Sequence, residues 1–253
     1  MELEYVRRKS PVIKLRLKFT KTGPIKFIGH LDVMRYFQKA IRRAEIDIKY
    51  SEGFSPHQIL SFAQPLSVGA TSDGEYLDMT VNSMVSTRDI MDRLNGVMNE
   101  GIEITAITEL DPGEEKAMTL SEAARYSVGF RKGGEPDFDW ISEFEKFLSG
   151  DRLPAMKKTK SGEKEIDMKP MIYEYSFDKE NGRVDLLLAM SSSATLKCAL
   201  LFEYFFRSMD REFDPMHLDI HRIDIYRGGS DEKGAFIEPF ITEDSGKRVY
   251  ING

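Results

Sequence analysis

The chain has 253 residues, of which 41% are hydrophobic and 31% charged, and a formal net charge of −6. This composition excludes a disordered chain, and the length allows one large domain or two of ordinary size. The longest apolar runs are far shorter than the roughly 20 residues that span a bilayer, and the first residues, MELEYVRRKSP, contain no apolar signal segment, so we expect a cytoplasmic protein.

The first half predicts the order strand, helix, strand, strand, helix, strand. Apolar and basic residues alternate in the first strand, which predicts a half-buried strand with Lys and Arg on its open face. The helix that follows is amphipathic and basic outside, and Ser86 or Thr87 is expected to cap the second helix, with Gly101 at its end. The predicted elements are the strand 12–20, the helix 30–45, the strands 46–50 and 74–82, the helix 86–101 and the strand 102–110.

The second half predicts a similar series: a strand at 124–130, a helix at 137–150, extended segments at 155–160 and 164–177, a buried strand at 183–192, an apolar helix at 195–209 and a strand at 218–227. This series predicts an α+β fold of two tandem ferredoxin-like βαββαβ units with antiparallel sheets. We expect one unit at 1–112, a join near 110–122, the second unit at 123–227, and a loosely ordered tail at 228–253 in which FIEPFI could pack as an arm.

The sequence contains no phosphate loop, dinucleotide fingerprint, nucleophile elbow or His-Glu-x-x-His motif. Its single cysteine, Cys198, excludes a multi-cysteine metal or iron–sulfur site within the chain. His217 and His221 are four residues apart in or beside a strand, a spacing of about 13 Å that does not suit a shared metal. We therefore expect neither a metal nor a cofactor, and we favour a protein that is not an enzyme.

His30 precedes the first helix, with Asp32 in the first helical turn. Asp32 favours the positive end of the helix dipole, so His30 could only complete the cap. The alternative is that His30 meets a phosphate at the exposed backbone N–H groups or acts as a general acid or base.

The loop YSEGFSPHQ holds Gly53, which permits a positive φ, and Pro56, which fixes the next turn. Both would position Phe54 and His57, and rigid loops of this kind often carry binding. Alternatively, Phe54 covers the edge of the sheet. Farther on, Gly69 and Gly74 flank a polar tip that is either a second binding loop or a plain connection.

The charge is unevenly distributed: residues 1–60 carry 13 Lys/Arg and 6 Asp/Glu, whereas residues 71–122 carry 3 Lys/Arg and 12 Asp/Glu. A lysine-rich segment, 156–170, flanks a flexible turn in the second half. Basic grooves with stacking aromatics hold single-stranded RNA, and Tyr76, Tyr173 and Tyr175 could supply the aromatics. A solvated, dipolar surface is the alternative.

The candidate substrate- or partner-binding residues are His30, Asp32, Arg35, Lys39, Arg42, Arg43, Ser51, Gly53, Phe54, Pro56, His57, Gly69, Gly74, Glu75, Lys157, Lys158 and Lys164.

The motifs F-x-x-H-L-D-x-M-R (27–35), Y-S-x-G-F-x-P-H (50–57), P-L-x-x-G (65–69) and G-E-Y-L-D (74–78) together resemble the signature of the radical-SAM-associated (radical SAM-linked) protein family of uncharacterised function. The resemblance covers about residues 12–227. Ile59 departs from it, because family members often carry lysine there. The resemblance implies a radical SAM enzyme as partner, and with one cysteine this chain would leave the radical chemistry to that partner.

Three functions remain open. The first is a non-catalytic accessory protein that binds RNA, or an RNA-linked substrate, for a radical SAM enzyme. The second, suggested by fold analogy with CRISPR repeat-processing endoribonucleases, is a metal-independent ribonuclease that uses His30 or His57, with Arg35 or Lys39 on the phosphate. The third is a pure protein-interaction module.

Overall fold

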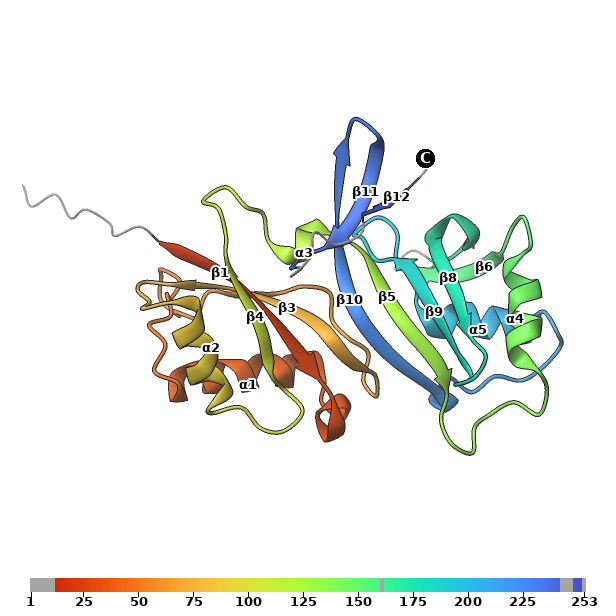
Figure 1. Cartoon of the computed structure of the whole chain (residues 1–253), viewed down its shortest axis with the longest axis horizontal. Coiled ribbons are helices and arrows are strands. Elements are labelled where there is room, and N and C mark those ends of the chain that lie inside the picture. The colour runs from red at the N-terminus through yellow and green to blue at the C-terminus, as the bar shows by residue number, and fades with distance from the viewer. Residues whose placement is uncertain (1–11, 160–161, 242–247, 252–253) are drawn as a thin grey trace, which may run out of the picture.

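The computed structural model describes residues 12–159, 162–241 and 248–251. The elements are arranged along one elongated molecule (Figure 1). In chain order they are β1 (Ile13–Lys21), η1 (Gly23–Phe27), α1 (His30–Arg43), β2 (Leu60–Phe62), β3 (Thr71–Val81), α2 (Thr87–Asn95), β4 (Ile104–Glu109), α3 (Ala117–Leu120), β5 (Ser121–Phe130), α4 (Trp140–Leu148), β6 (Pro154–Thr159), β7 (Gly162–Asp167), η2 (Lys169–Met171), β8 (Ile172–Asp178), β9 (Arg183–Ala189), α5 (Cys198–Arg207), η3 (Pro215–His217), β10 (Leu218–Asp231), β11 (Gly234–Pro239) and β12 (Val249–Tyr250).

The first half forms the strand order β4-β1-β3-β2, with antiparallel neighbours throughout. Alternate residues of β1 and β3, such as Leu17 and Leu77, face α1 and α2 and form a buried apolar core with Phe37 and Leu94. The buried residues of helix α1 recur every three to four positions, which is the pattern of an amphipathic helix that packs on a sheet.

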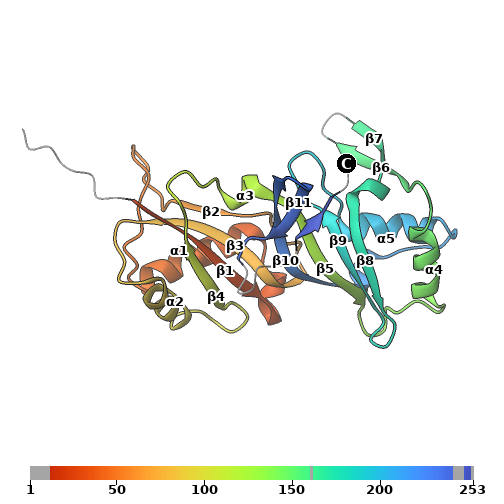
Figure 2. The ribbon, with the colours of Figure 1, turned by 45° about the horizontal axis from the view of Figure 1, so that its top comes forward.

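The second half forms the order β10-β5-β9-β8, again with antiparallel neighbours. Helices α4 and α5 cover these strands with an aromatic core in which the rings of Phe144 and Phe202 lie 4.7 Å apart. Strands β6 and β7 form a separate two-stranded hairpin beside this sheet (Figure 2).

The two halves share one sheet of ten strands, because β3 and β10 run side by side in parallel. Only two residue pairs define the register of this contact, His221 with Thr71 and Arg222 with Ser72. The predicted mixture of helices with mostly antiparallel strands is confirmed. The two halves are nevertheless joined edge to edge into one sheet rather than carrying separate sheets.

The basic face predicted to be open on β1 is covered. The connection from Leu110 to α3 crosses this face, and Arg16 is only 2% exposed. The ring of Phe240 lies 4.6 Å from the Arg16 guanidinium carbon. Because Asp78 stands opposite Arg16 in the register of β1 and β3, the arginine finds its counter-charge inside the protein rather than in solvent.

The segment after Gly228 is more ordered than the sequence predicts. Strand β10 continues to Asp231 and turns back into β11, which pairs with it residue by residue. Ile237 in β11 is fully buried, so part of FIEPFI packs as the arm that the sequence allowed. Residues 242–247 lie outside the described ranges.

Two predicted elements differ in their limits. The strand expected at 46–50 is reduced to bridges such as Ile48 with Val81, because β2 occupies the edge of β3. Helix α2 begins as predicted, since Ser86 Oγ accepts a hydrogen bond from the Asp89 N–H, but it ends at Asn95 rather than near Gly101. Among the helices that the structure describes, none has the length and apolarity required to cross a membrane.

Candidate functional site

The loop at 51–57 is closed by side-chain and backbone hydrogen bonds at its base. Ser51 Oγ lies 2.9 Å from His57 Nδ1 and accepts a hydrogen bond from the His57 N–H, while the Ser51 N–H donates to the His57 carbonyl. Gly53 takes a φ of +113°, which only glycine adopts without strain. Phe54 is fully exposed at the tip, so it does not cover the sheet edge.

Helix α1 presents its basic side chains to solvent. Arg35, Lys39, Arg42 and Arg43 are all exposed. Arg35 forms a surface ion pair with Asp32 at 3.0 Å, a contact that contributes little in solvent. Arg43 donates to the Val97 carbonyl on the side of α2. Lys39 and Arg42 have no ion-pair partner among the described residues.

His30 begins α1 without capping it. Gly29 is the N-cap residue, and no side chain accepts a hydrogen bond from the first turn. The half-buried imidazole instead packs edge-on against Phe62, with ring centroids 5.5 Å apart. The prediction that His30 completes the cap is therefore wrong.

The loop contacts the middle of α1 rather than its start. Gln58, directly after the loop, donates from Nε2 to the Gln38 carbonyl. Gln38 is eight residues after His30, which is about 12 Å along a helix at 1.5 Å per residue. Arg42 lies one turn beyond Gln38 on the same side of the helix. Phe54 and His57 are thus expected next to Gln38 and Arg42 and not beside His30.

We call this area, formed by residues 51–57 with Arg35, Lys39 and Arg42, the loop–helix surface. It combines an exposed aromatic ring with three cations on a helix of the same half. Arg43 points toward α2 and lies at its margin. This arrangement can stack on a planar group and attract an anion at the same time.

The candidate residues Gly69, Gly74 and Glu75 belong instead to the joint between the two halves. The Gly69 N–H donates to the Lys26 carbonyl, and its own carbonyl accepts from Arg131 in the second half. A Cβ at Gly74 would lie 2.6 Å from Asp224 Cα, so only glycine lets β10 approach β3 this closely.

Glu75 is buried and pairs with Arg222 of β10, whose Nη1 lies 3.0 and 3.1 Å from the two carboxylate oxygens. Arg222 also donates to the carbonyls of Gln64 and Pro65. Burial raises the pKa of the Glu75 carboxyl, and the neighbouring Arg222 guanidinium opposes that rise. Lys21 and Glu75 line one small pocket, and burial there lowers the pKa of the Lys21 amine.

A second polar contact across the joint involves Tyr76, Asp224 and Lys18. The Tyr76 hydroxyl donates to Asp224 Oδ1 at 2.7 Å, and Lys18 Nζ donates to Oδ2 at 2.7 Å. Tyr76 is 1% exposed, so it is not the solvent-facing aromatic that the alternation in its strand predicted. Burial raises the pKa of the Asp224 carboxyl, against the effect of Lys18.

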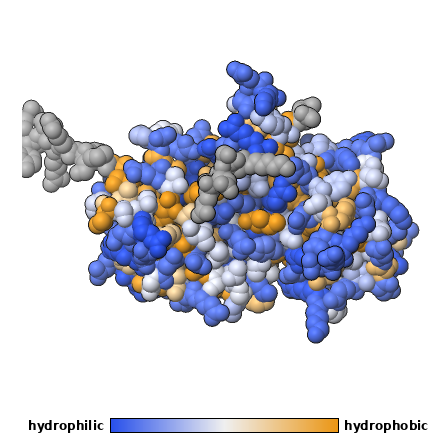
Figure 3. Space-filling model, viewed as in Figure 1, coloured by the Kyte–Doolittle hydropathy of each residue, from blue (hydrophilic) through white to orange (hydrophobic). Residues whose placement is uncertain are grey.

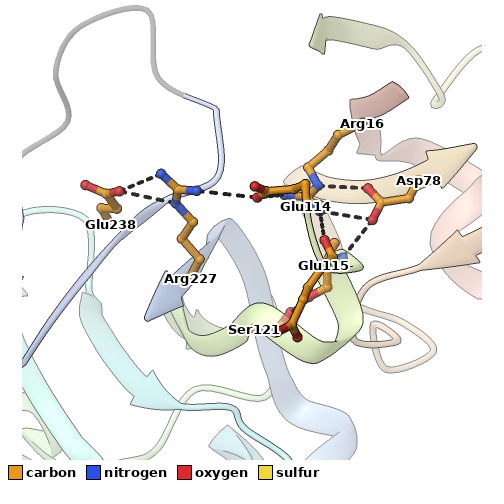
Figure 4. A network of polar contacts seen from close by, with 8 residues as sticks. Arg16, Asp78, Glu114, Glu115, Ser121, Arg227 and Glu238 are labelled. Atoms are coloured by element: carbon orange, nitrogen blue, oxygen red, sulfur yellow. Dashed lines mark hydrogen bonds and ion pairs between the residues drawn. The ribbon is translucent and has the colours of Figure 1, made fainter. Parts of the chain in front are cut away.

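A third network lies under the connection between the halves (Figure 4). Arg16 Nε and Nη2 donate to both oxygens of Asp78, and the Ala117 N–H donates to Asp78 Oδ2 at 2.7 Å. Glu114 lies 3.5 Å from Arg16 and 3.6 Å from Arg227, which pairs in turn with Glu238. The motif G-E-Y-L-D thus supplies Glu75 and Tyr76, which bond to β10 across the joint, and Asp78, which binds the connection between the halves.

The lysine-rich hairpin is not brought to the loop–helix surface. Lys157 and Lys158 lie in β6, where Lys157 pairs in register with Lys164 of β7. Lys164 is exposed. The side chains of Lys157 and Lys158, and the whole of Lys160, lie outside what the structure describes. The hairpin belongs to the second half, next to β8 (Figure 2).

The described residues contain no group of three or more His, Cys, Asp or Glu side chains that could hold a metal ion. Cys198 is buried, and burial raises the pKa of its thiol to about 12, so the thiolate required of a nucleophile does not form near neutral pH.

The polar groups that sequence reasoning missed are Lys21, Arg16, Arg222 and Asp224. Arg16 and Asp78 are 62 residues apart, and Glu75 and Arg222 are 147 residues apart. No local pattern pairs such residues. The one available signal was the pair of carboxylates Glu75 and Asp78, which flank Tyr76 and Leu77 in β3.

We expect the buried Asp224 carboxyl to make stability depend on pH. A carboxyl whose pKa is raised binds its proton more tightly in the native state than in the unfolded chain. The free energy of unfolding therefore falls as the pH rises above the ordinary aspartate pKa of about 4. In Asp224→Asn this fall should be smaller, measured by urea unfolding at a series of pH values. Asp92→Asn, at an exposed carboxylate of α2, should keep the wild-type dependence. An equal fall in Asp224→Asn would contradict the assignment.

Comparison with known proteins gives a family but no activity. A family model described as "Uncharacterized protein conserved in bacteria (DUF2344)" matches residues 14–198. This range includes β1 through the start of α5, and with it the loop–helix surface and the G-E-Y-L-D motif. No curated protein matches the chain.

Proposed function

The chain belongs to the bacterial family DUF2344, and we propose that it is a non-catalytic binding protein that holds RNA, or an RNA-linked substrate, for a radical SAM enzyme. The observation that carries the RNA-binding part is the fully exposed Phe54 on a closed loop whose base is hydrogen-bonded to α1, a helix with exposed cations. The radical SAM partner is supported by the sequence resemblance alone.

The exposure of Phe54 argues for recognition. Burying an aromatic side chain removes a large apolar area from water, so a phenylalanine ring held in solvent is unfavourable for a protein on its own. The hydrogen bonds between Ser51 and His57 limit the freedom of the loop, which lowers the entropy cost of binding. Stacking on a base does not require a particular sequence, because every base has a π-face.

The cations of the loop–helix surface supply the second part of an RNA site. Arg35, Lys39 and Arg42 occupy one exposed side of α1, spaced about one helical turn apart. Lysine and arginine at this spacing can neutralise successive phosphates, and the released counterions make such binding weaken as salt increases. The surface therefore favours a single strand whose bases are free to stack.

The ferredoxin-like character of the halves is also part of the proposal. Among the four main strands of each half, the fourth, first, third and second lie side by side in that order, in both halves. The repetition of one order supports two related βαββαβ units, in the second of which the β6–β7 hairpin is an insertion between α4 and β8.

A second candidate function, docking of a protein partner, has its own observation. Phe27, Leu31 and Val68 are 60%, 58% and 63% exposed, and the Gly69 N–H to Lys26 carbonyl bond holds two of their segments together. On the face shown in Figure 3, apolar atoms gather over the first half and the second half is mainly hydrophilic. The area around Phe27, Leu31 and Val68 is the place where the radical SAM enzyme would bind.

We expect Phe54→Leu to weaken the binding of a mixed-sequence single-stranded RNA by about tenfold, because leucine keeps apolar bulk but cannot stack. Phe54→Tyr should bind like the wild type. The measurement is fluorescence anisotropy at low and at high salt, with the samples run on a gel to detect any cleavage.

Tyr175→Leu is the matched control, since Tyr175 is an exposed aromatic of β8 in the second half. If Phe54→Leu and Tyr175→Leu lose RNA affinity equally, the RNA does not bind specifically at the loop–helix surface. No binding at low salt would remove the RNA function and leave protein docking, whereas cleavage lost in His57→Ala would favour the ribonuclease alternative.

A further inference from the structure

A cavity of about 330 Å³ opens at one end of the second half. Its lining comes from the segment after β5, residues 131–138, and from the segment before β10, residues 211–217. The course of these two segments can be followed in Figure 1. The Arg131 N–H donates to the His217 carbonyl, which fixes the two segments to each other. This volume is in the range of pockets that bind small molecules.

The apolar wall of the cavity is aromatic. The ring centroid of Phe206, on α5, lies 5.9 Å from that of Phe138 and 5.2 Å from that of Phe213. Phe206 is 7% exposed and anchors the group in the core, whereas Phe138 and Phe213 are only partly buried. These rings offer π-faces at the wall, where a cation is attracted.

The same wall already binds a cation of the chain itself. The guanidinium carbon of Arg211 lies 4.3 Å from the centroid of the Phe138 ring, and Arg211 Nη1 pairs with Asp137 at 2.9 Å. An aromatic face with a carboxylate beside it is thus a cation-binding arrangement that this structure shows directly.

The remaining charge of the cavity is negative. Glu135, Glu212 and Asp214 also line it. Glu135 accepts from the Gly133 N–H, and Asp214 accepts from the Met216 N–H and lies 3.9 Å from His217. Glu212 has no hydrogen bond or ion pair to any residue that the structure describes. With Arg211 occupied by Asp137, these carboxylates leave an excess of negative charge around the aromatic wall.

We propose that this cavity binds a small organic cation, an ammonium or guanidinium group on an apolar or aromatic stem. The stem would lie against Phe213, since Arg211 already covers Phe138, and the cationic group would reach Glu212. The site is independent of the RNA function, since it is built in the other half and one of its two segments lies beyond residue 198, where the family match ends.

The test uses the full chain and three probes that share a phenethyl stem. They are phenethylammonium, its neutral counterpart 2-phenylethanol and the anion 3-phenylpropionate, and each is titrated into the protein by calorimetry. We expect phenethylammonium to bind about tenfold more tightly than 2-phenylethanol, and Glu212→Gln to remove most of that difference. Glu180→Gln, at an exposed turn outside the cavity, should bind as the wild type does.

Equal binding of the ammonium and the alcohol would overturn the proposal, as would no binding of either. Tighter binding of 3-phenylpropionate would overturn it in favour of an anion site at Arg211 and His217. Because Glu212 is exposed, the fold of Glu212→Gln should be unaffected, which a thermal unfolding curve checks.

Discussion

Replacing Arg222 by leucine should lower the free energy of unfolding by about 3–5 kcal/mol. Arg222 is 3% exposed and Glu75 is 6% exposed, so the substitution leaves a buried carboxylate without its counter-charge. It also removes the donor to the carbonyls of Gln64 and Pro65. Urea unfolding followed by circular dichroism measures the effect.

The matched control is Arg207→Leu on α5, whose exposed pair with Glu203 should contribute about 0.5 kcal/mol or less. The double variant Arg222→Leu/Glu75→Leu should recover much of the lost stability, because a buried pair replaced by apolar residues leaves no unpaired charge. A loss below about 1 kcal/mol in Arg222→Leu would show that the pair does not hold the halves together.

Replacing Gly74 by valine should cost about 3 kcal/mol, the upper part of the range for overpacking a tight site. A Cβ at this position would meet the Cα of Asp224 at 2.6 Å and the carbonyl oxygen of Ile223 at 2.7 Å. Both are backbone atoms, which cannot move aside as a flexible side chain can. Strand β10 would have to separate from β3, where only two residue pairs set the register.

Gly113→Val is the control for this change, because a Cβ at Gly113 meets nothing within 4 Å. The unfolding midpoint of this variant should stay near that of the wild type, while Gly74→Val unfolds at lower urea. If the two variants unfold together, the close approach of β3 and β10 is not required for stability.

The sequence predicted most elements because their signals are local. Helix α1 follows from apolar residues at helical spacing, and the start of α2 follows from the Ser86 side chain. The end of α2 was placed too late because Gly96, not Gly101, closes the helix, and Gly101 takes its φ of +96° in the loop that follows, against the Thr22 carbonyl. That contact depends on a distant segment, which local spacing does not reveal.

The joint between the halves could not be predicted either, because its contacts also join residues that are far apart in the sequence. Alternation in β3 makes Asp78 read as a solvent-facing residue, and alternation in β1 makes Arg16 read as part of an open basic face. Folding places Arg16 opposite Asp78, and Glu75 opposite Arg222 of the other half. Charged residues that the sequence suggests are free to bind a ligand are therefore paired with each other inside the protein.

The loop at 51–57 was better predicted than its surroundings. Gly53, Pro56 and the Ser51–His57 pair are neighbours in sequence, so a rigid loop follows from the residues themselves. The exposure of Phe54 does not, because the sequence left open whether Phe54 covers the sheet edge. The position of the loop along α1 does not follow either, because the Gln58 to Gln38 hydrogen bond that sets it spans 20 residues. That hydrogen bond places the base of the loop at Gln38, away from His30 at the start of α1.

Photo-crosslinking of a single-stranded RNA that carries 4-thiouridine, followed by mass spectrometry of the crosslinked peptides, tests the proposed surface most directly. Crosslinks should fall in residues 50–58 and in α1, and Phe54→Leu should reduce them. Crosslinks confined to the β6–β7 hairpin or to the second half, or no crosslinks at low salt, would contradict RNA binding at the loop–helix surface.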